Sequence, residues 1–351
     1  MTAVGPGPRI RSGTRILSIA HCRPSRSLTN DDLSTMVDTS AGWVRSRVGI
    51  ATRHIAAADE SVTDMADDAA AKAVAGAGVD AADIGLVIVA TCTAVDRMPS
   101  IAARVVQRLE IPDAAAFDLN AACAGFSCAL ATAALAIQGG SSRVALVVGV
   151  DRMSDFLDRQ DRSTCVILGD GAGAAVIAAT EGNEPDGVGP VVWGSRPQDG
   201  SAITQGTPGP SGPPAPFRQG GGRTVHHWAP TALAPVARQA CERAEVAVPD
   251  LAAVVTDQAN PRIIEAVTRQ LGATGAIIAR DVDGVGNTSA ASIPLALSKL
   301  VERGEVPGGA PVLLLGFGAG LSFAAQVVAC PAASSWRSTC REGAGRVERN
   351  P

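Results

Sequence analysis

The feature that most constrains this chain of 351 residues is the alternation of continuous apolar runs with longer helical patterns. The runs at 84–90 and 143–150 have the uninterrupted apolar character of strands buried on both faces. Segments such as 64–77 and 261–271 carry apolar residues at helical spacing. This alternation predicts an α/β protein with a mostly parallel sheet. Because the second half repeats the pattern, we expect an internal duplication, although similarity between the halves is weak residue by residue.

The same reasoning places the remaining elements. Further strands are expected at 15–20, 115–119, 251–256, 277–278 and 311–315, and further helices at 28–44 (with Asn30 as the candidate N-cap), 99–109, 230–243 and 288–303. Segment 163–179 reads as two strands joined by a turn at its Gly-Asp-Gly-Ala-Gly run, with Asp170 as a turn residue. The Gly- and Pro-rich stretch 199–222 is expected to be a long loop, and 331–351 a disordered tail.

Composition excludes several classes of function. The net charge is −4 without a basic run, which argues against nucleic acid as a partner. No apolar run has the length of a membrane span, and 1–14 lacks the apolar core of a signal peptide. The eight cysteines form no CxxC pair and the four histidines no zinc pattern, so we expect no metal site and a reduced, cytoplasmic protein.

One cysteine stands in a setting typical of a nucleophile. Cys123 follows an apolar run, lies among small residues (Asn120-Ala-Ala-Cys-Ala-Gly-Phe126) and precedes a long Ala/Leu pattern, which predicts a strand, a tight turn and a helix that starts at the cysteine. A thiol at a helix N-terminus favours the thiolate, and nearby N–H groups could bind an oxyanion. A buried structural cysteine is the alternative, and this segment alone does not decide between them.

Four ordered segments together resemble β-ketoacyl-acyl-carrier-protein synthase III and its relatives in the thiolase superfamily. They are Asn120–Phe126, Asp257-Gln-Ala-Asn260, Gly286-Asn-Thr-Ser-Ala-Ala-Ser292 and Gly316-Phe-Gly-Ala-Gly320. Segments around Met36–Trp43, Gly49–Ile55 and Gly169–Ala175 are also similar to the family, so the resemblance covers about 14–330. It implies the thiolase fold, in which two duplicated α/β halves form a five-layer α-β-α-β-α arrangement. The halves would be 14–182 and 183–330, and the enzyme a homodimer.

The resemblance also assigns roles to residues. Cys123 would take an acyl group from coenzyme A or a carrier protein, and Asn287 would hydrogen-bond the carbonyl of the second thioester. The N–H of Ala319 would complete an oxyanion hole with that of Cys123. The remaining candidates are Trp43, Arg47 and Arg162 for coenzyme A, Met98 for the partner's acyl pocket, and Phe126 as a possible site residue. No permanently bound cofactor is implied, because the coenzyme A or phosphopantetheine thioester is a substrate.

Asp257 departs from the family pattern, in which the second segment begins with histidine. That histidine donates a hydrogen bond to the malonyl thioester carbonyl, whereas an ionised aspartate only accepts. Loss of such a donor costs about 10² to 10³ in rate. Decarboxylative condensation is then crippled unless burial keeps Asp257 protonated. An ionised Asp257 could instead act as a general base for a hydroxyl or amine acceptor.

Two further positions differ from the family. Counted back from Asp257, Arg223 lies where the family often has an asparagine that touches the cofactor, and His226 where it usually has a channel-lining aromatic residue. His226 could supply a displaced imidazole, or have no role.

Three functions are therefore open. The first, which we favour on the sequence, is an acyltransferase that passes the acyl group from Cys123 to a hydroxyl or amine in a specialised pathway. The second is a condensing enzyme that works with malonyl carrier protein in fatty-acid or polyketide priming. The third is a non-catalytic partner subunit with a thiolase fold.

Overall fold

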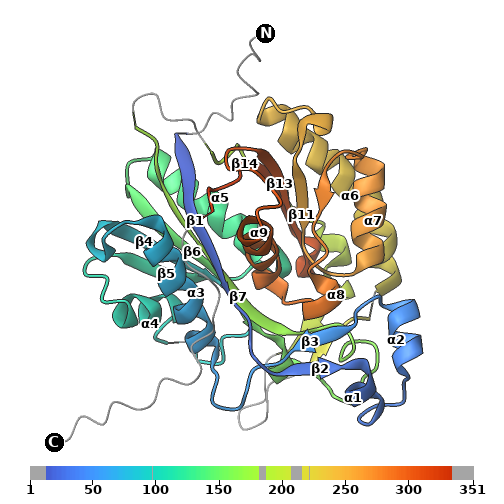
Figure 1. The fold of residues 1–351 in the computed structure, drawn as a ribbon. Helices are drawn as coiled ribbons and strands as arrows, with labels where there is room; N and C mark the ends of the chain where they lie inside the picture. The colour runs from blue at the N-terminus through green and yellow to red at the C-terminus, as the bar shows by residue number, and fades with distance from the viewer. Residues whose placement is uncertain (1–12, 97, 182–186, 207–215, 221, 334–351) are drawn as a thin grey trace, which may run out of the picture.

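The computed structural model describes residues 13–96, 98–181, 187–206, 216–220 and 222–333, without the side chains of 222–227. Two five-stranded sheets form its framework (Figure 1). The first has the order β1 (Thr14–Cys22), β7 (Asp170–Ala179), β6 (Val144–Arg152), β4 (Ile84–Ala90) and β5 (Ala115–Leu119). The second has the order β12 (Ile277–Ile278), β11 (Ala253–Thr256), β13 (Pro311–Phe317), β14 (Phe323–Ala329) and β8 (Val192–Gly194).

Helices cover both sheets and fill the space between them, and two short ribbons complete the fold. The helices are α1 (Asn30–Ser34), α2 (Ala41–Arg47), α3 (Val62–Ala77), α4 (Ile101–Arg108), α5 (Gly125–Gln138), α6 (Gly222–Arg243), α7 (Pro261–Leu271), α8 (Val282–Val285) and α9 (Ser292–Glu302). The ribbons pair β2 (Ser27–Thr29) with β3 (Thr52–His54), and β9 (Thr204–Gln205) with β10 (Phe217–Arg218).

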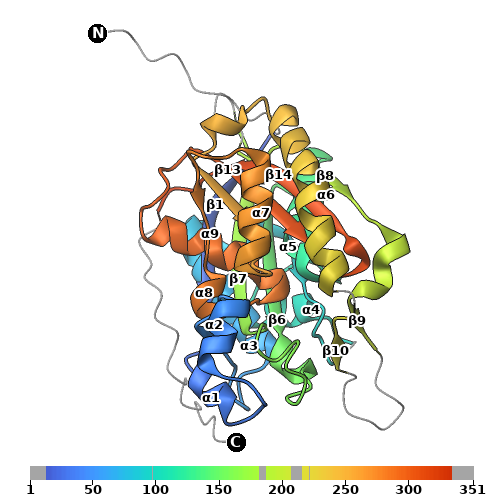
Figure 2. The same ribbon diagram turned by 90° about the vertical axis from the view of Figure 1, so that its right-hand side faces the viewer.

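The layers follow the order α-β-α-β-α, which confirms the predicted thiolase-like arrangement. Helices α3 and α4 lie on the outer face of the first sheet, and α6 and α7 on the outer face of the second (Figures 1 and 2). Helices α5 and α9 lie between the sheets, where Phe126 and Leu297 join side chains of both sheets in one apolar cluster. The two halves thus share their central core.

Glycines allow the central layer to approach the first sheet closely. A Cβ added to Gly149 of β6 would lie 2.3 Å from the carbonyl oxygen of Ala290, and one added to Gly173 of β7 would lie 2.7 Å from Cβ of Pro294. The start of α9 therefore rests directly on the backbone of the first sheet. This contact brings a turn of the second half against strands of the first.

The internal duplication predicted from the sequence is visible in the topology. Taken in chain order, β1, β4, β5, β6 and β7 occupy the same places in their sheet as β8, β11, β12, β13 and β14 do in theirs. Helices α5 and α9 are likewise equivalent, because each precedes the third parallel strand of its sheet. The carboxyl ends of β4 and β5, which pair in parallel at Ala90 and Leu119, lie at one edge of the first sheet.

The expectation of mostly parallel sheets was wrong. In the first sheet β4 pairs in parallel with β5 and β6, and in the second β11 pairs in parallel with β12 and β13. In contrast, β6 with β7 and β13 with β14 pair antiparallel. These antiparallel strands follow their neighbours without a crossover helix, which parallel pairing requires. The outer strands β1 and β8 also pair antiparallel, so both sheets are mixed.

Two local predictions were also wrong. The expected helix at 28–44 is two helices, because Thr29 caps α1 and the Ser40 hydroxyl accepts a hydrogen bond from the Trp43 N–H to start α2. Asn30, the expected cap, lies inside α1 and binds the Ile50 carbonyl. The second case is 163–179, where the glycine-rich run lies inside strand β7 rather than in a turn. Asp170 is the first residue of that strand and is fully buried.

Seven cysteines lie in the described ranges, and all of them are free thiols. No described helix combines the length and the apolar character that crossing a membrane requires. Cys340 and the expected tail at 331–351 fall largely outside the described residues, which end at 333. Part of the expected loop at 199–222 is regular, since it contains β9 and β10.

Candidate active site

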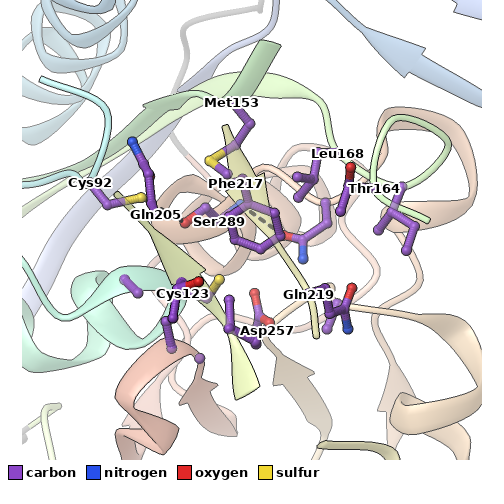
Figure 3. Close-up of a pocket in the computed structure, with 18 of the residues that line it drawn as sticks. Cys92, Cys123, Met153, Thr164, Leu168, Gln205, Phe217, Gln219, Asp257 and Ser289 are labelled. Atoms are coloured by element: carbon purple, nitrogen blue, oxygen red, sulfur yellow. Dashed lines mark hydrogen bonds between the residues drawn. The ribbon is translucent and has the colours of Figure 1, made fainter. Parts of the chain in front are cut away.

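A pocket of about 500 Å³ lies where the two halves meet. It is lined by Cys123, Asp257, Asn287 and Ala319, four of the residues that the sequence placed in the site. Figure 3 shows Cys123 and Asp257 on one side of this pocket, with Cys92, Met153 and Leu168 on the other. The ribbon strands β9 and β10 contribute Gln205 and Phe217 to the lining. The structure therefore brings the nucleophile candidate and its expected partners together.

The turn that carries Cys123 has an unusual backbone. It joins β5 to α5 through a short 3-10 segment, Ala122–Ala124, so α5 itself begins at Gly125, two residues after the cysteine at which the sequence predicted the helix to start. Ala122 has a φ of 47°, which is rare for a residue other than glycine. The Asn120 carboxamide oxygen accepts a hydrogen bond from the Ala122 N–H at 3.1 Å and supports this conformation. The turn places Cys123 at the positive end of α5.

The resting state of Cys123 differs from the sequence-based expectation of a favoured thiolate. Burial raises the pKa of the Cys123 thiol well above its usual range, and the nearby Asp257 raises it further. A hydrogen bond with Ser289 acts in the opposite direction on this pKa. Because burial dominates, Cys123 is a neutral thiol in this structure, and it would have to lose its proton before it could act as a nucleophile.

The turn after β13 packs tightly against Cys123. A Cβ on Gly318 would lie 2.8 Å from the Cys123 nitrogen and 2.9 Å from its Cβ, so only glycine fits there. Gly320, two residues on, has a φ of 76°, the left-handed region that favours glycine. Ala319 between them lines the pocket beside Cys123. In the motif Gly318-Ala319-Gly320, the close contact with Cys123 thus requires the first glycine, and the left-handed backbone conformation favours the second.

Asp257 is a buried carboxyl group at the end of β11. Its backbone N–H donates to the Leu315 carbonyl at 2.8 Å, and its Oδ1 accepts a hydrogen bond from the Ser292 hydroxyl at 2.8 Å. The residue is 1% exposed. Burial raises the pKa of Asp257 to about 8, while the hydrogen bonds from Ser292 and the Gln258 N–H oppose the rise. The carboxyl is therefore mostly protonated at neutral pH and can donate a hydrogen bond.

Asn287 lies on the loop between α8 and α9 with its backbone held on both sides. Its N–H donates to the Ile167 carbonyl, and its own carbonyl accepts from the Gly169 N–H, both at 2.9 Å. The side-chain Oδ1 accepts a hydrogen bond from the Ser289 N–H at 2.8 Å. With its oxygen engaged, the amide presents its NH₂ group as the donor for a ligand.

The residues expected to bind coenzyme A lie apart from the pocket lining. Arg162 stacks on Trp43, with its Cζ 4.7 Å from the ring centroid, and donates a hydrogen bond to the Asp38 carbonyl at 3.0 Å. Arg47 is exposed at the last residue of α2, one turn after Trp43. The structure thus brings Trp43 and Arg162 into contact, and Arg47 lies on the same short helix as Trp43.

The four remaining candidate site residues are Phe126, Met98, Arg223 and His226. Phe126 is fully buried in the core between the sheets and does not line the pocket, because its side chain packs toward Gly149 of the first sheet. Met98 is 88% exposed and does not line this chain's pocket. Arg223 and His226 lie in the first turns of α6, and their side chains lie outside the described residues.

Cys92 and Ser289 are among the pocket residues that the sequence reasoning missed. Cys92 follows β4 at the same sheet edge as Cys123, and its Sγ lies 3.7 Å from Oγ of Ser289. Ser289 belongs to the Gly286–Ser292 motif, so the motif contained the signal although only Asn287 was singled out. Within the described ranges, no cluster of His, Cys, Asp and Glu has the arrangement of a metal site.

Comparisons with known proteins agree with this geometry. The family model for 3-oxoacyl-[acyl-carrier-protein] synthase III matches residues 117–197, and the model for its C-terminal part matches residues 241–330. The β-ketoacyl-[acyl-carrier-protein] synthase III 4 of Streptomyces coelicolor is 56% identical over 322 residues, which cover 92% of this chain and 100% of the relative.

Solved structures lead to the same family. The priming β-ketosynthase of the R1128 polyketide pathway superposes with a TM-score of 0.87 at 39% identity, covering 95% of this chain and 100% of that one. Synthase III of Pseudomonas aeruginosa superposes with a TM-score of 0.86 at 36% identity, covering 92% and 99%. From its sequence, its fold and its pocket alike, the chain belongs to the β-ketoacyl-[acyl-carrier-protein] synthase III family of condensing enzymes.

Proposed function

We propose that this enzyme catalyses decarboxylative condensation, in which an acyl group on Cys123 is joined to a malonyl group on a carrier protein. The observation that carries the proposal is the burial of Asp257 in the pocket of Cys123 and Asn287, which raises its pKa to about 8. Protonated Asp257 and the Asn287 amide would both donate to the malonyl thioester carbonyl. They would stabilise the enolate that forms as carbon dioxide leaves.

This proposal reverses the order of functions that the sequence alone favoured. An ionised Asp257 would accept protons and repel the enolate, which is why acyl transfer to a hydroxyl or amine seemed preferable. Burial removes that objection, because the neutral acid replaces the expected histidine donor. The names of similar proteins, a synthase III and a priming β-ketosynthase, favour condensation as well.

The first half-reaction would load Cys123 from an acyl-coenzyme A. We propose that the N–H groups of Cys123 and Ala319 form the oxyanion hole for the tetrahedral intermediate. The adenine would stack with Trp43 and Arg162, which already face each other. Arg47 and Arg223 would contact the phosphates. A carrier protein would deliver the second substrate as a phosphopantetheine thioester.

The pH dependence of carbon dioxide release tests the role of Asp257. With acyl-coenzyme A and malonyl carrier protein, the rate is expected to fall about tenfold per pH unit above pH 8, because the donating form of Asp257 is lost. The matched variant Asp257→Asn keeps a donor at every pH, so its rate should be independent of pH in this range. Asp257→Ala should lose about 10² to 10³ in rate at pH 7.

A rate that rises through pH 8 would contradict condensation by a protonated Asp257. If hydroxyl or amine acceptors are then acylated with the same rising profile, Asp257 acts as a general base and the enzyme is an acyltransferase to oxygen or nitrogen. The position of the carboxyl beside Cys123 favours this as the second candidate function. The two functions thus predict opposite slopes in one experiment.

We also propose that the enzyme is a homodimer that pairs through the β5 side of the first sheet. Strand β5 is an edge strand, and Phe117 on it is 41% exposed. Val95 and Met98, on the segment after β4, are 63% and 88% exposed. A second copy covering them would remove the open edge and the apolar side chains from water. Light scattering should give twice the chain mass of 35.4 kDa, whereas a monomer would contradict the proposal.

A further inference from the structure

Ser292 is a buried serine at the start of α9 whose hydroxyl contacts Asp257. It is 2% exposed and does not belong to the pocket lining. The hydroxyl donates to Oδ1 of Asp257 at 2.8 Å, and its oxygen accepts from the Gln258 N–H at 3.3 Å. Among the described residues, this carboxyl group is the acceptor that the hydroxyl proton reaches. Because a hydroxyl has one proton, the hydrogen bonds run in one direction, from Gln258 through Ser292 to Asp257.

The first half of the chain has no hydroxyl at the equivalent position. Gly125 begins α5 as Ser292 begins α9, and each follows the asparagine of its turn by five residues. A Cβ added to Gly125 would lie 3.1 Å from Cβ of Ala90, at the end of β4. The duplicated scaffold therefore forms without a side chain at this position. In the second half the hydroxyl meets a pocket carboxyl group, which favours a role in the site over a role in the fold.

Asp257 is a buried carboxyl group to which the structure gives no cationic partner. It is 1% exposed, and among the described residues no Lys, Arg or His side chain acts on it. An unpaired buried carboxylate is unfavourable, so the neutral form is preferred, in agreement with a pKa raised to about 8 by burial. The other titratable side chains of the described lining are Cys92 and Cys123, and burial raises the pKa of both thiols well above the usual value. All three groups are therefore mostly uncharged at pH 7.

The two oxygens of Asp257 have different surroundings. A neutral carboxyl group has one carbonyl oxygen, which accepts hydrogen bonds, and one hydroxyl, which donates. Ser292 and the Gln258 N–H both act on Asp257 as donors, and Ser292 binds Oδ1. Oδ1 is therefore the carbonyl oxygen, and Oδ2 carries the proton. Since Ser292 lies outside the pocket lining and Asp257 within it, Oδ2 is the oxygen left for a ligand beside Cys123 (Figure 3).

We propose that Ser292 is a positioning residue that keeps the proton of Asp257 on Oδ2, where the neutral acid can donate to the malonyl thioester carbonyl. The proposal rests on the condensation proposed above and deepens it. Asn287 is oriented by the same device, because the Ser289 N–H engages its Oδ1 at 2.8 Å and leaves the NH₂ group as the donor. Both partners of the enolate thus present a donor because their acceptor oxygen is already occupied.

Infrared spectroscopy of the full-length enzyme without substrate tests this assignment. The C=O stretching band of neutral Asp257 is identified by its loss in Asp257→Asn. In Ser292→Ala this band should move to higher frequency, because the carbonyl oxygen loses its hydrogen bond. Its disappearance on ionisation should also move to higher pH, by about 0.7 pH units, since a hydrogen bond that favours the ionised form is gone. Ser298→Ala is the matched control, because this buried hydroxyl of the same helix lies 2.9 Å from Nδ1 of His21, and the band should not move.

Reaction rates separate positioning from a structural role of Ser292. With acetyl-coenzyme A and malonyl carrier protein at pH 7, Ser292→Ala should lower carbon dioxide release about tenfold, the equivalent of one lost hydrogen bond. Self-acylation of Cys123, followed by intact mass, should stay within about twofold of wild type, because Asp257 acts in the second half-reaction. In an Asp257→Ala background, Ser292→Ala should cost no further rate, because the serine acts through the carboxyl group.

Three results would overturn the proposal. A band that stays in place in Ser292→Ala would show that Oδ1 is not the accepting oxygen, and a wild-type spectrum with no band lost in Asp257→Asn would show an ionised Asp257. Equal losses of rate with and without Asp257 would mean that Ser292 only supports the fold. If Ser292→Ala is unstable, Ser292→Cys, a weaker donor of similar size, should give a smaller shift in the same direction. If the band moves as expected but the wild-type enzyme releases no carbon dioxide, the proposed function fails while Ser292 still orients the acid.

Discussion

The turn at 120–123 and the turn at 287–290 have the same construction but different chemistry. In each, an asparagine side chain accepts a hydrogen bond from the N–H two residues later, at 3.1 Å from Ala122 and 2.8 Å from Ser289. Those residues have φ values of 47° and 52°, and each turn leads through a 3-10 segment into a central helix. The fourth position is Cys123 in one turn and Ala290 in the other.

The difference shows how a duplicated scaffold divides one reaction. The first turn supplies Cys123, the proposed nucleophile, and the side chain of its asparagine hydrogen-bonds the backbone at the edge of the pocket. The second supplies Asn287 and Ser289 to the pocket, while Ala290 is 1% exposed and binds Asp151 through its N–H. Equivalent backbones thus present a thiol from one side and hydrogen-bond donors from the other.

The largest effect is expected from exchanging the fourth positions of the two turns. Cys123→Ala should abolish the acyl adduct in intact-mass measurements with a panel of acyl-coenzyme A donors, since the nucleophile is gone. Ala290→Cys in the same chain should not restore it, because position 290 is buried away from the pocket lining. An adduct that persists in Cys123→Ala would contradict the assignment, and a wild-type chain without an adduct would favour a non-catalytic subunit.

A smaller but selective effect is expected from the two asparagines. Both Asn120→Ala and Asn287→Ala remove a hydrogen bond to a backbone N–H, which costs about 1 kcal/mol of stability in each case. Only Asn287→Ala should also lower the condensation rate by about 10² to 10³, since it removes a donor to the substrate. Asn120→Ala is the matched control and should stay within tenfold of wild type. Equal losses of rate in both would mean that the asparagines act only through backbone support.

The smallest effect concerns stability and compares the two buried carboxyl groups. Asp151 accepts hydrogen bonds from four neighbouring groups, whereas the side chain of Asp257 interacts with only two, the Ser292 hydroxyl and the Gln258 N–H. Between pH 3.8 and about 8 the folded chain keeps a proton on Asp257 that the unfolded chain releases, so the free energy of unfolding falls as pH rises through this range.

Asp257→Asn removes this titration. The variant should gain stability over wild type progressively from about pH 4 to pH 8, by a few kcal/mol at the upper end. Urea midpoints across pH measure the difference. A stability difference that is constant across this range would show that Asp257 has an ordinary pKa in the folded enzyme.

The sequence predicts elements that follow from local patterns better than elements that depend on contacts between distant residues. The Cys123 turn, strand β4 and helix α7 follow from local patterns and lie where they were expected. Strand β7 was misread because its glycines suggested a turn. They are needed instead for contact with α9, and a contact between residues distant in the chain leaves no local signal.

The protonation of Asp257 marks another limit of sequence reasoning. The residue type alone suggests an ionised base, and the resemblance to the family suggests a missing donor. Its pKa depends on its burial, on Ser292 from α9 and on the Gln258 N–H, which come together only in the folded chain. The sequence identified the residue, and the packing around it determines its charge.

The contact between Gly318 and Cys123 has a consequence for re-engineering this enzyme. The turn that carries Cys123 and the turn after β13 have no free space between their backbones at Gly318, so neither can be remodelled alone. A library that varies residues 120–124 should therefore vary 317–321 together with them. Specificity can be altered more independently on the opposite wall, where β9 and β10 contribute Gln205 and Phe217 from a two-stranded ribbon outside both sheets.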